Sequence, residues 1–350
     1  MHKTGSSSIQ NHFNTTTYPS IKYARWKEPN HSGMYALLTK DDQSSREHFA
    51  FKQRGEKFLE QLPMMRSQWR ESLIEDLETL GDRRLLFSAE LISAPPGRPW
   101  LERFATFLRQ YTDSIEAIAY VRSPRSYAVS TFQQQLKGPN YRELKLEFLW
   151  PKYRERFSQL DDIVGRSSVT LRHFSPQVLL GGDVVQDFAN IIGITLQSYS
   201  RHQLNTTLSA ESTALLYVQR RLGQGFVGGF DGAFRVNRIF LDYLRPIGNG
   251  KLYFDDRAWD DVENFNRPDQ AWMEGRLGQD LAEHPPADVI SISSEQELFD
   301  VAVANQDALY AAVPEEVHCN HHDPLKRITL TLDALQQHCL QSIKQTRQAS

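Results

Sequence analysis

Short apolar runs, flanked by polar or turn residues, recur in the first half of the chain. They cover residues 84–88, 116–121 and 168–172. Runs of this length with such flanks are typical of buried strands. The pattern therefore predicts three strands in this part of the protein.

Around these runs, apolar residues recur with helical spacing. The helical pattern covers residues 58–80, 99–111 and 183–193. Strands that alternate with helices imply a parallel sheet covered on both faces. Beyond residue 195 the pattern becomes mainly helical. The predicted fold class is α/β, a parallel sheet flanked by helices, with a largely helical C-terminal portion.

Composition and charge narrow the possible functions. The chain has 350 residues, of which 40% are hydrophobic and 24% charged, and this is ordinary for a globular protein. Its net charge of −3 argues against broad binding to nucleic acid or acidic membranes, which requires a basic surplus. No apolar run reaches the ~18–20 residues of a membrane span, and the polar first residues are unlike a signal peptide. Two cysteines, Cys319 and Cys339, provide no disulfide framework, so a cytoplasmic protein is expected.

Candidate chemistry begins at the third residue. Lys3 and Gly5 start a hydroxyl-rich run that leads into an amphipathic stretch. Glycine permits a tight turn, N–H groups at a helix start point outward, and the lysine supplies positive charge. The segment therefore has the chemistry of an anion cradle. Its lysine precedes the glycine, whereas in the nucleotide triphosphatase loop the lysine follows the second glycine.

This order resembles the 5′-phosphosulfate loop of sulfotransferases that use 3′-phosphoadenosine-5′-phosphosulfate (PAPS). The version found here looks like a bacterial branch related to polysaccharide sulfotransferases. The resemblance implies a P-loop-like sheet in which Lys3 and Gly5 shape the donor site. It also implies that the 5′-phosphate is bound by Thr4, Ser6, Ser7 and Ser8. Members of the family place a strand just before this loop; here Met1 and His2 precede Lys3, so that strand is missing or formed by very few residues.

A second motif follows the predicted strand over residues 116–121. Arg122 comes directly after this strand, and Ser130 lies eight positions later, about two turns along a helix that Pro124 can start. Ligands of open α/β sheets bind at the carboxyl edge, where Arg122 can pair with a phosphate while Ser130 donates its hydroxyl. The pair resembles the 3′-phosphate-binding motif of sulfotransferases. The continuation over residues 130–137 looks like that of bacterial carbohydrate-modifying members.

Looser similarity to the same family extends further along the chain. It covers residues 169–174, 181–194 and 271–278. The resemblance therefore implies a sulfotransferase-like domain over residues 1–280, followed by a C-terminal helical extension over residues 281–350.

Sulfuryl transfer requires a cation near the sulfonate and a base near the acceptor hydroxyl. Lys3 is the predicted cation. His31 is the first choice for the base, because a neutral imidazole accepts a proton near pH 7 without a large pKa shift. It also lies where carbohydrate sulfotransferases place a Lys-Glu and histidine cluster. Glu28 of the same cluster and Glu90, which follows a predicted strand, are the alternatives.

A His- and Cys-rich run over residues 318–322 has the residue types of a zinc site. Structural zinc sites usually draw paired ligands from two separated clusters, and here only His338 and Cys339 could supply the second. We interpret this run as part of the protein surface, and the proposed sulfuryl transfer requires no metal.

The sequence therefore predicts an enzyme with PAPS as donor substrate. The resemblance implies a carbohydrate hydroxyl as acceptor, in capsule, exopolysaccharide or lipopolysaccharide. One alternative is a P-loop kinase for a small molecule, which would need Mg²⁺ ligands and a lysine after the loop glycine. The other is a non-catalytic, nucleotide-binding member of the fold, which the missing strand would favour.

Overall fold

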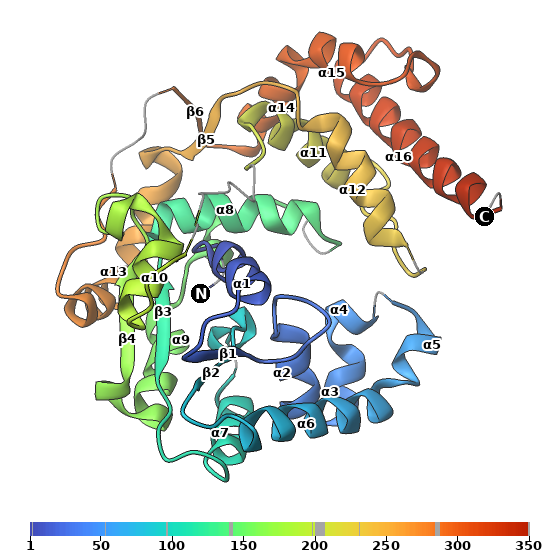
Figure 1. Ribbon diagram of the computed structural model, residues 1–350. Helices are drawn as coiled ribbons and strands as arrows, with labels where there is room; N and C mark the ends of the chain where they lie inside the picture. Colours follow the sequence, from blue (N-terminus) through green and yellow to red (C-terminus); the bar gives the residue numbers. More distant parts are fainter. Residues whose placement is uncertain are drawn as a thin grey trace. The chain divides into compact units, whose positions relative to one another are not determined.

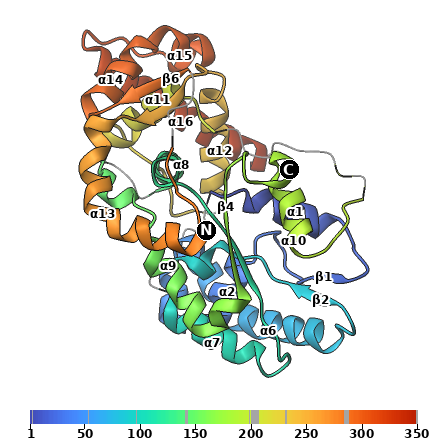
Figure 2. The ribbon, with the colours of Figure 1, turned by 90° about the vertical axis from the view of Figure 1, so that its left-hand side faces the viewer.

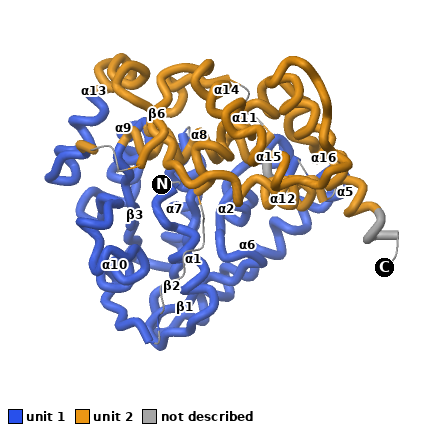
Figure 3. Tube along the Cα trace, turned by 90° about the horizontal axis from the view of Figure 1, so that it is seen from above, with its two compact units in different colours: residues 1–123, 152–205, 268–281 blue, residues 124–151, 206–267, 282–350 orange. Residues whose placement is uncertain are grey.

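The computed structural model describes residues 1, 3–52, 54–95, 97–139, 143–197, 199, 207–230, 232–283 and 288–348 (Figure 1). The chain forms two compact units, each built from separate stretches (Figure 3). Unit 1 comprises residues 1–123, 152–205 and 268–281, and unit 2 comprises residues 124–151, 206–267 and 282–350. The predicted single domain over residues 1–280 is thus shared between the two units.

Unit 1 contains two pairs of parallel strands. β1 (Ile21–Tyr23) pairs with β2 (Arg84–Leu86), and the two lie side by side in Figure 2. β3 (Ala117–Val121) pairs with β4 (Val169–His173) in a register that aligns the first residues of both strands. The three predicted strands are confirmed as β2, β3 and β4, and the mixed α/β class with parallel pairing is confirmed with them. β1 was not predicted.

Regular α-helices and shorter helical turns accompany these strands. The α-helices of unit 1 are α1 (Ser6–Thr15), α2 (Ser32–Thr39), α3 (Asp42–Glu47), α4 (Phe49–Lys52), α5 (Glu56–Leu59), α6 (Leu62–Glu78), α7 (Arg98–Leu108), α9 (Tyr153–Leu160) and α10 (Val184–Ile191). Turns of 3-10 helix are η1 (Glu90–Ser93), η4 (Arg166–Ser168) and η5 (Leu180–Gly182), and η3 (Asp161–Gly165) is a π-helical turn. The predicted helical patterns correspond to α5 with α6, to α7 and to α10.

The core of unit 1 consists of several apolar clusters. One brings α1 and α10 together, with Ile9 and Phe13 against Val185 and Phe188. Another joins α2, α6 and α7 through residues such as Leu73 and Phe104. These clusters form because the apolar stripe of each helix has no other surface to cover it. The packing of α10 against α1 fixes the position of the Lys3–Gly5 turn described below.

Unit 2 is mainly helical. Its helices are α8 (Pro124–Lys137), η2 (Leu146–Leu149), α11 (Ala210–Leu222), α12 (Ala233–Leu244), α14 (Glu295–Ala304), α15 (Gln306–Ala312), η6 (Glu315–Val317) and α16 (Pro324–Gln348). Helix α13 (Asp256–Leu277) begins in unit 2 and ends in unit 1, with Pro268 at the boundary. A parallel pair, β5 (Lys251–Phe254) with β6 (Val289–Ile292), interrupts the helices and was not predicted. No helix within the described ranges is both long and apolar enough to cross a membrane.

Candidate functional site

The turn before α1 has an unusual backbone. Lys3 and Gly5 both adopt left-handed conformations, with φ of 66° and 72°. A Cβ at Gly5 would lie 2.7 Å from Cγ1 of Val184 and 3.0 Å from the ring of Phe174. Glycine is therefore required twice, once for the backbone angle and once for the close approach of α10.

The start of α1 offers N–H groups to an anion. The N–H groups of Ser8 and Ile9 bond to the carbonyl oxygen of Gly5, and the earlier N–H groups have no acceptor inside the helix by virtue of helix geometry. Gly5, as N-cap, provides no side chain to cover them, and the first turn contains no acidic residue. The positive end of the helix dipole is thus left for a negative group from elsewhere.

The hydroxyl groups of the loop differ in their burial and in their hydrogen-bond partners. Thr4 is buried, and its hydroxyl donates to the carbonyl oxygen of Met1 at 2.7 Å, so it holds the loop itself. Ser6 donates its hydroxyl to the carboxylate of Glu90. Ser7 and Ser8 are half-buried on the first turn of α1. Of the four predicted phosphate ligands, Thr4 is therefore the one whose side chain faces inward.

Glu90 meets the loop although it lies far away in the sequence. It is the first residue of η1, a few positions after β2 ends, and that location brings its carboxylate to the start of α1. Asn30 donates from Nδ2 to its second oxygen at 3.5 Å. A carboxylate is stabilised at this end of a helix. Glu90 is thus the predicted base that the fold brings to the loop.

Two cationic residues, Lys3 and Arg122, belong to the loop cluster. Arg122, directly after β3, donates from Nη1 to the carbonyl oxygen of Lys3 at 3.0 Å, and its guanidinium lies 5.9 Å from the ring centroid of Phe174. Tyr153 donates its hydroxyl to the carbonyl oxygen of Arg122 at 2.5 Å. Burial lowers the pKa of the Lys3 ammonium, Glu90 opposes that shift, and Arg122 adds to it. The loop therefore combines Lys3, Arg122 and Glu90 in one place.

His31 does not fit its predicted role. The N–H of Ser88 donates to Nδ1 at 2.9 Å, and Nε2 lies 2.9 Å from the carbonyl oxygen of Ala24, so the tautomer that satisfies both carries its proton on Nε2. The ring is buried between Tyr23 and Phe87. Burial lowers its pKa to about 4, although the bond to Ala24 opposes this. Because both nitrogens contact backbone groups, His31 ties the ends of β1 and β2 together, and its predicted role as the base has less support than that of Glu90.

Two further predicted site residues, Glu28 and Ser130, belong to different units. The Glu28 carboxylate is half-exposed and pairs with Arg54 at 3.1 Å. Ser130 is on α8 and belongs to unit 2, whereas Arg122 belongs to unit 1. The two residues of the predicted 3′-phosphate motif are therefore described in separate units.

Three polar residues near the loop were missed by the sequence analysis. Asn30 bonds to Glu90, as above, and its Oδ1 accepts the N–H of Ser32 at 2.9 Å. Arg156 is buried and donates to the carbonyl oxygen of Ser93 at 3.1 Å. His173 ends β4, with Nε2 2.9 Å from the hydroxyl of Ser123. Burial lowers the pKa of His173. Its position at a strand end was the only signal that could have pointed to it.

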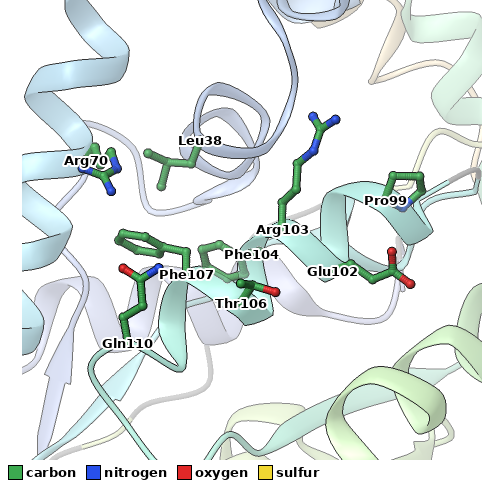
Figure 4. Close-up of a pocket in the computed structure, with 9 residues that line it drawn as sticks. All are labelled: Leu38, Arg70, Pro99, Glu102, Arg103, Phe104, Thr106, Phe107 and Gln110. Carbon is green, nitrogen blue, oxygen red and sulfur yellow. The ribbon is translucent and has the colours of Figure 1, made fainter.

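A surface pocket of about 500 Å³ lies elsewhere in unit 1, between α2, α6 and α7 (Figure 4). Its cationic side chains are Arg70, which lies 5.3 Å from the ring centroid of Phe107, and Arg103, which donates to the carbonyl oxygen of Thr39. None of the predicted site residues lines it. The candidate site is therefore the loop at the start of α1.

Comparison of the chain with protein-family models, with curated proteins and with solved structures finds no match. Within the described residues, no group of three or more His, Cys, Asp or Glu side chains is arranged to hold a metal ion. The proposal that follows therefore depends on the residues of the loop and their contacts.

Proposed function

We propose that the chain transfers a sulfuryl group from PAPS to a hydroxyl, that of a carbohydrate, and that its loop is a P-loop-like phosphate site. One observation carries the proposal: Lys3, Ser6, Glu90 and Arg122 meet at the uncapped start of α1. This combination supplies positive charge, N–H donors and a carboxylate in the same place. A kinase reading has weaker support, because the lysine precedes the loop glycine.

In the proposed reaction, the acceptor oxygen attacks the sulfur while the bond from sulfur to the phosphate oxygen breaks. The N–H groups at the start of α1 and the hydroxyls of Ser6, Ser7 and Ser8 hold the 5′-phosphate. Lys3 compensates the charge that develops on the leaving oxygen. The products are the sulfated acceptor and adenosine 3′,5′-bisphosphate. Positioning and electrostatics supply most of the rate, as in phosphoryl transfer.

Glu90 is the proposed base that takes the proton of the acceptor hydroxyl. In the present structure its carboxylate already accepts a hydrogen bond from a hydroxyl, that of Ser6. An acceptor hydroxyl would make the same kind of bond before it loses its proton. Glu28 is a weaker candidate, because its carboxylate pairs with Arg54.

Arg122 is the proposed ligand of the 3′-phosphate. Its guanidinium carries several N–H donors, and one of them, Nη1, holds the carbonyl oxygen of Lys3. A bidentate pair with phosphate is the strongest contact that such a side chain makes. Arg122 would then tie the donor's 3′ end to the same loop that holds its 5′ end.

The test is a calorimetric titration of adenosine 3′,5′-bisphosphate into the wild-type protein, Arg122→Ala and Arg98→Ala, with ATP as the control ligand. Arg98 is the matched control because it is half-exposed on α7 and pairs with Glu102 and Asp162. We expect micromolar binding to the wild type and to Arg98→Ala, and at least tenfold weaker binding to Arg122→Ala.

Tighter binding of ATP than of the bisphosphate would favour the kinase alternative. Absence of bisphosphate binding to the folded wild-type protein would refute the transferase proposal. Bisphosphate binding without transfer of labelled sulfate to any polysaccharide would favour the non-catalytic alternative. Where transfer is detected, Glu90→Gln should lower its rate by about 10²–10⁴, while Glu28→Gln leaves it unchanged.

A further inference from the structure

A cavity of about 460 Å³ lies inside unit 1, between β2 and β3. Its lining follows both strands, from Arg83 and Ser114 at one end to Glu90 and Tyr120 at the other. Met1 also lines it. The cavity, called the slot below, therefore extends along all of β2 and along β3 as far as Tyr120.

β2 presents a backbone edge to the slot. Among the described residues, β2 pairs with β1 and with no second strand. The N–H of Arg84 bonds to the carbonyl oxygen of Ser20, and the carbonyl oxygen of Leu86 accepts from Ala24, so both residues face β1. Because backbone groups alternate sides along a strand, those of Leu85 and Phe87 face the slot.

β3 presents a second edge, opposite the first. In the described part of the chain it pairs with β4 only. The carbonyl oxygen of Val121 accepts from the N–H of Phe174, just beyond β4. By the same alternation, the backbone groups of Ile118 and Tyr120 face the slot. Two parallel edges with the same polarity therefore line one cavity.

Apolar side chains cover the slot on both faces. One face comes from the α1 and α10 cluster, and the other from the cluster of α6 and α7. The lining side chains used here are Ile9, Phe188 and Ile192 on the first face and Leu77, Phe104 and Leu108 on the second. Covered faces of this kind are typical of the central strands of parallel sheets.

The amino group of Met1 lies at one end of the slot. It donates to the carbonyl oxygen of Tyr120 at 3.1 Å, which is one of the groups that face the slot. Burial lowers the pKa of this amino group to about 5, and Glu90 only partly opposes that shift. An amide N–H at the same place would make the same bond without burying a charge.

We propose that the slot is a strand-acceptor site: it takes an extended apolar segment of about five residues, joined to the Met1 nitrogen and parallel to β2 and β3. The segment would bond to both edges and unite the two strand pairs of unit 1 in one parallel sheet. Since both faces are covered, the segment must be apolar throughout. Its end would lead directly into the Lys3–Gly5 turn and anchor it. The strand site does not depend on the proposed transferase activity.

The test uses two fusion proteins of the full chain. One adds five valine and isoleucine residues before Met1, and the control adds five glycine and serine residues. We expect amide hydrogen exchange at Leu85, Phe87, Ile118 and Tyr120 to slow at least tenfold in the first fusion protein relative to the second. The amides of Leu86 and Ala119 face β1 and β4, and should change much less.

Equal exchange in the two fusion proteins, or slowing without this alternation along the strands, would overturn the proposal. A second readout is the binding of Nile red, a neutral apolar dye, to the unextended chain. If the slot takes the strand, the valine–isoleucine fusion protein should lose dye binding that the glycine–serine fusion protein keeps. Dye that binds both fusion proteins equally, while neither shows the exchange pattern, would identify the slot as a pocket for small apolar molecules.

Discussion

Two helices of unit 1 start after glycine turns and pack against each other, yet their first turns are chemically opposite. Helix α10 follows Gly181 and Gly182, and its N-cap Asp183 accepts the N–H groups of Val185 and Gln186 at 2.8 and 3.1 Å. Helix α1 follows Gly5, its N-cap residue, which has no side chain to bond to its N–H groups, and its first turn contains no acidic residue. A carboxylate of the same chain segment, that of Asp183, therefore occupies the start of α10, whereas the N-cap of α1 provides none.

A glycine turn before a helix is therefore not enough to make an anion site. The turn exposes the N–H groups, but a residue such as Asp183 at the N-cap occupies them within the same chain. At α1 the nearest carboxylate, that of Glu90, comes from a distant segment and bonds to the hydroxyl of Ser6. An incoming phosphate can displace such a contact, whereas it cannot displace a cap that is part of the helix start.

The largest expected effect comes from the glycine that separates the two helices. Gly5→Ala places a Cβ in a left-handed conformation and 2.7 Å from Val184, the first residue of α10. We expect it to lower the free energy of unfolding by about 3 kcal/mol, of which roughly 1–2 kcal/mol is backbone strain and the rest is the clash. Chemical denaturation of the full chain measures the loss.

Gly193→Ala is the matched control for this substitution. Gly193 also has a left-handed backbone, with φ of 67°, but no heavy atom lies within 4 Å of its added Cβ. Gly193→Ala should therefore lower the free energy of unfolding by the backbone strain alone, about 1–2 kcal/mol. Equal losses in the two variants would contradict the view that the close approach of α10 shapes the loop.

Much of unit 1 was predictable because its signals are local. The runs that became β2, β3 and β4 are apolar with polar flanks, and the loop carries its chemistry in consecutive residues. β1, β5 and β6 were missed because strands of three or four residues are too short to establish a period. β2 is equally short, and it was predicted only because it lies in a longer apolar run over residues 84–88. Their pairing depends on partners that are distant in the sequence.

The roles of the site residues were less predictable for the same reason. His31 has the residue type of a base, but two backbone groups from β1 and β2 flanks occupy both of its nitrogens. Glu90 reaches Ser6 across 84 positions of sequence. Such contacts are set by the fold, and no local pattern distinguishes a buried histidine from a catalytic one.

An intermediate loss of stability is expected when the charge of Asp187, the second carboxylate of α10, is removed. Asp187 is buried, and its carboxylate accepts from Arg172, from the hydroxyl of Tyr120 and from the N–H of Leu180. Burial alone would raise its pKa, but these partners together lower it. Asp187→Asn should therefore cost about 1–3 kcal/mol at pH 7.

The direction of the pKa shift determines how the stabilisation by the Asp187 carboxylate depends on pH. Because the folded pKa lies below the unfolded value of 3.8, the carboxylate stabilises the protein above that value, and the contribution is lost as pH falls through the folded pKa. Asp187→Asn should flatten the loss of stability below about pH 4. Asp162→Asn, at a half-exposed carboxylate paired with Arg98, should change neither quantity noticeably. An unchanged acid profile in Asp187→Asn would mean that α10 is not held by its charge.

The smallest change in stability is expected when α1 receives a carboxylate in its own first turn. This substitution also tests the difference between α1 and α10 most directly. Ser7 lies in the first turn, so Ser7→Asp should stabilise the helix by about 0.3–1 kcal/mol relative to Ser7→Asn, its uncharged isostere. The same substitution should weaken binding of adenosine 3′,5′-bisphosphate at least tenfold, because the new carboxylate takes the place of the phosphate. Stability tests the effect of the helix dipole, and affinity tests whether the start of α1 binds the phosphate. If Ser7→Asp stabilises the protein but leaves the affinity unchanged, the dipole effect is supported and the start of α1 is not the anion site.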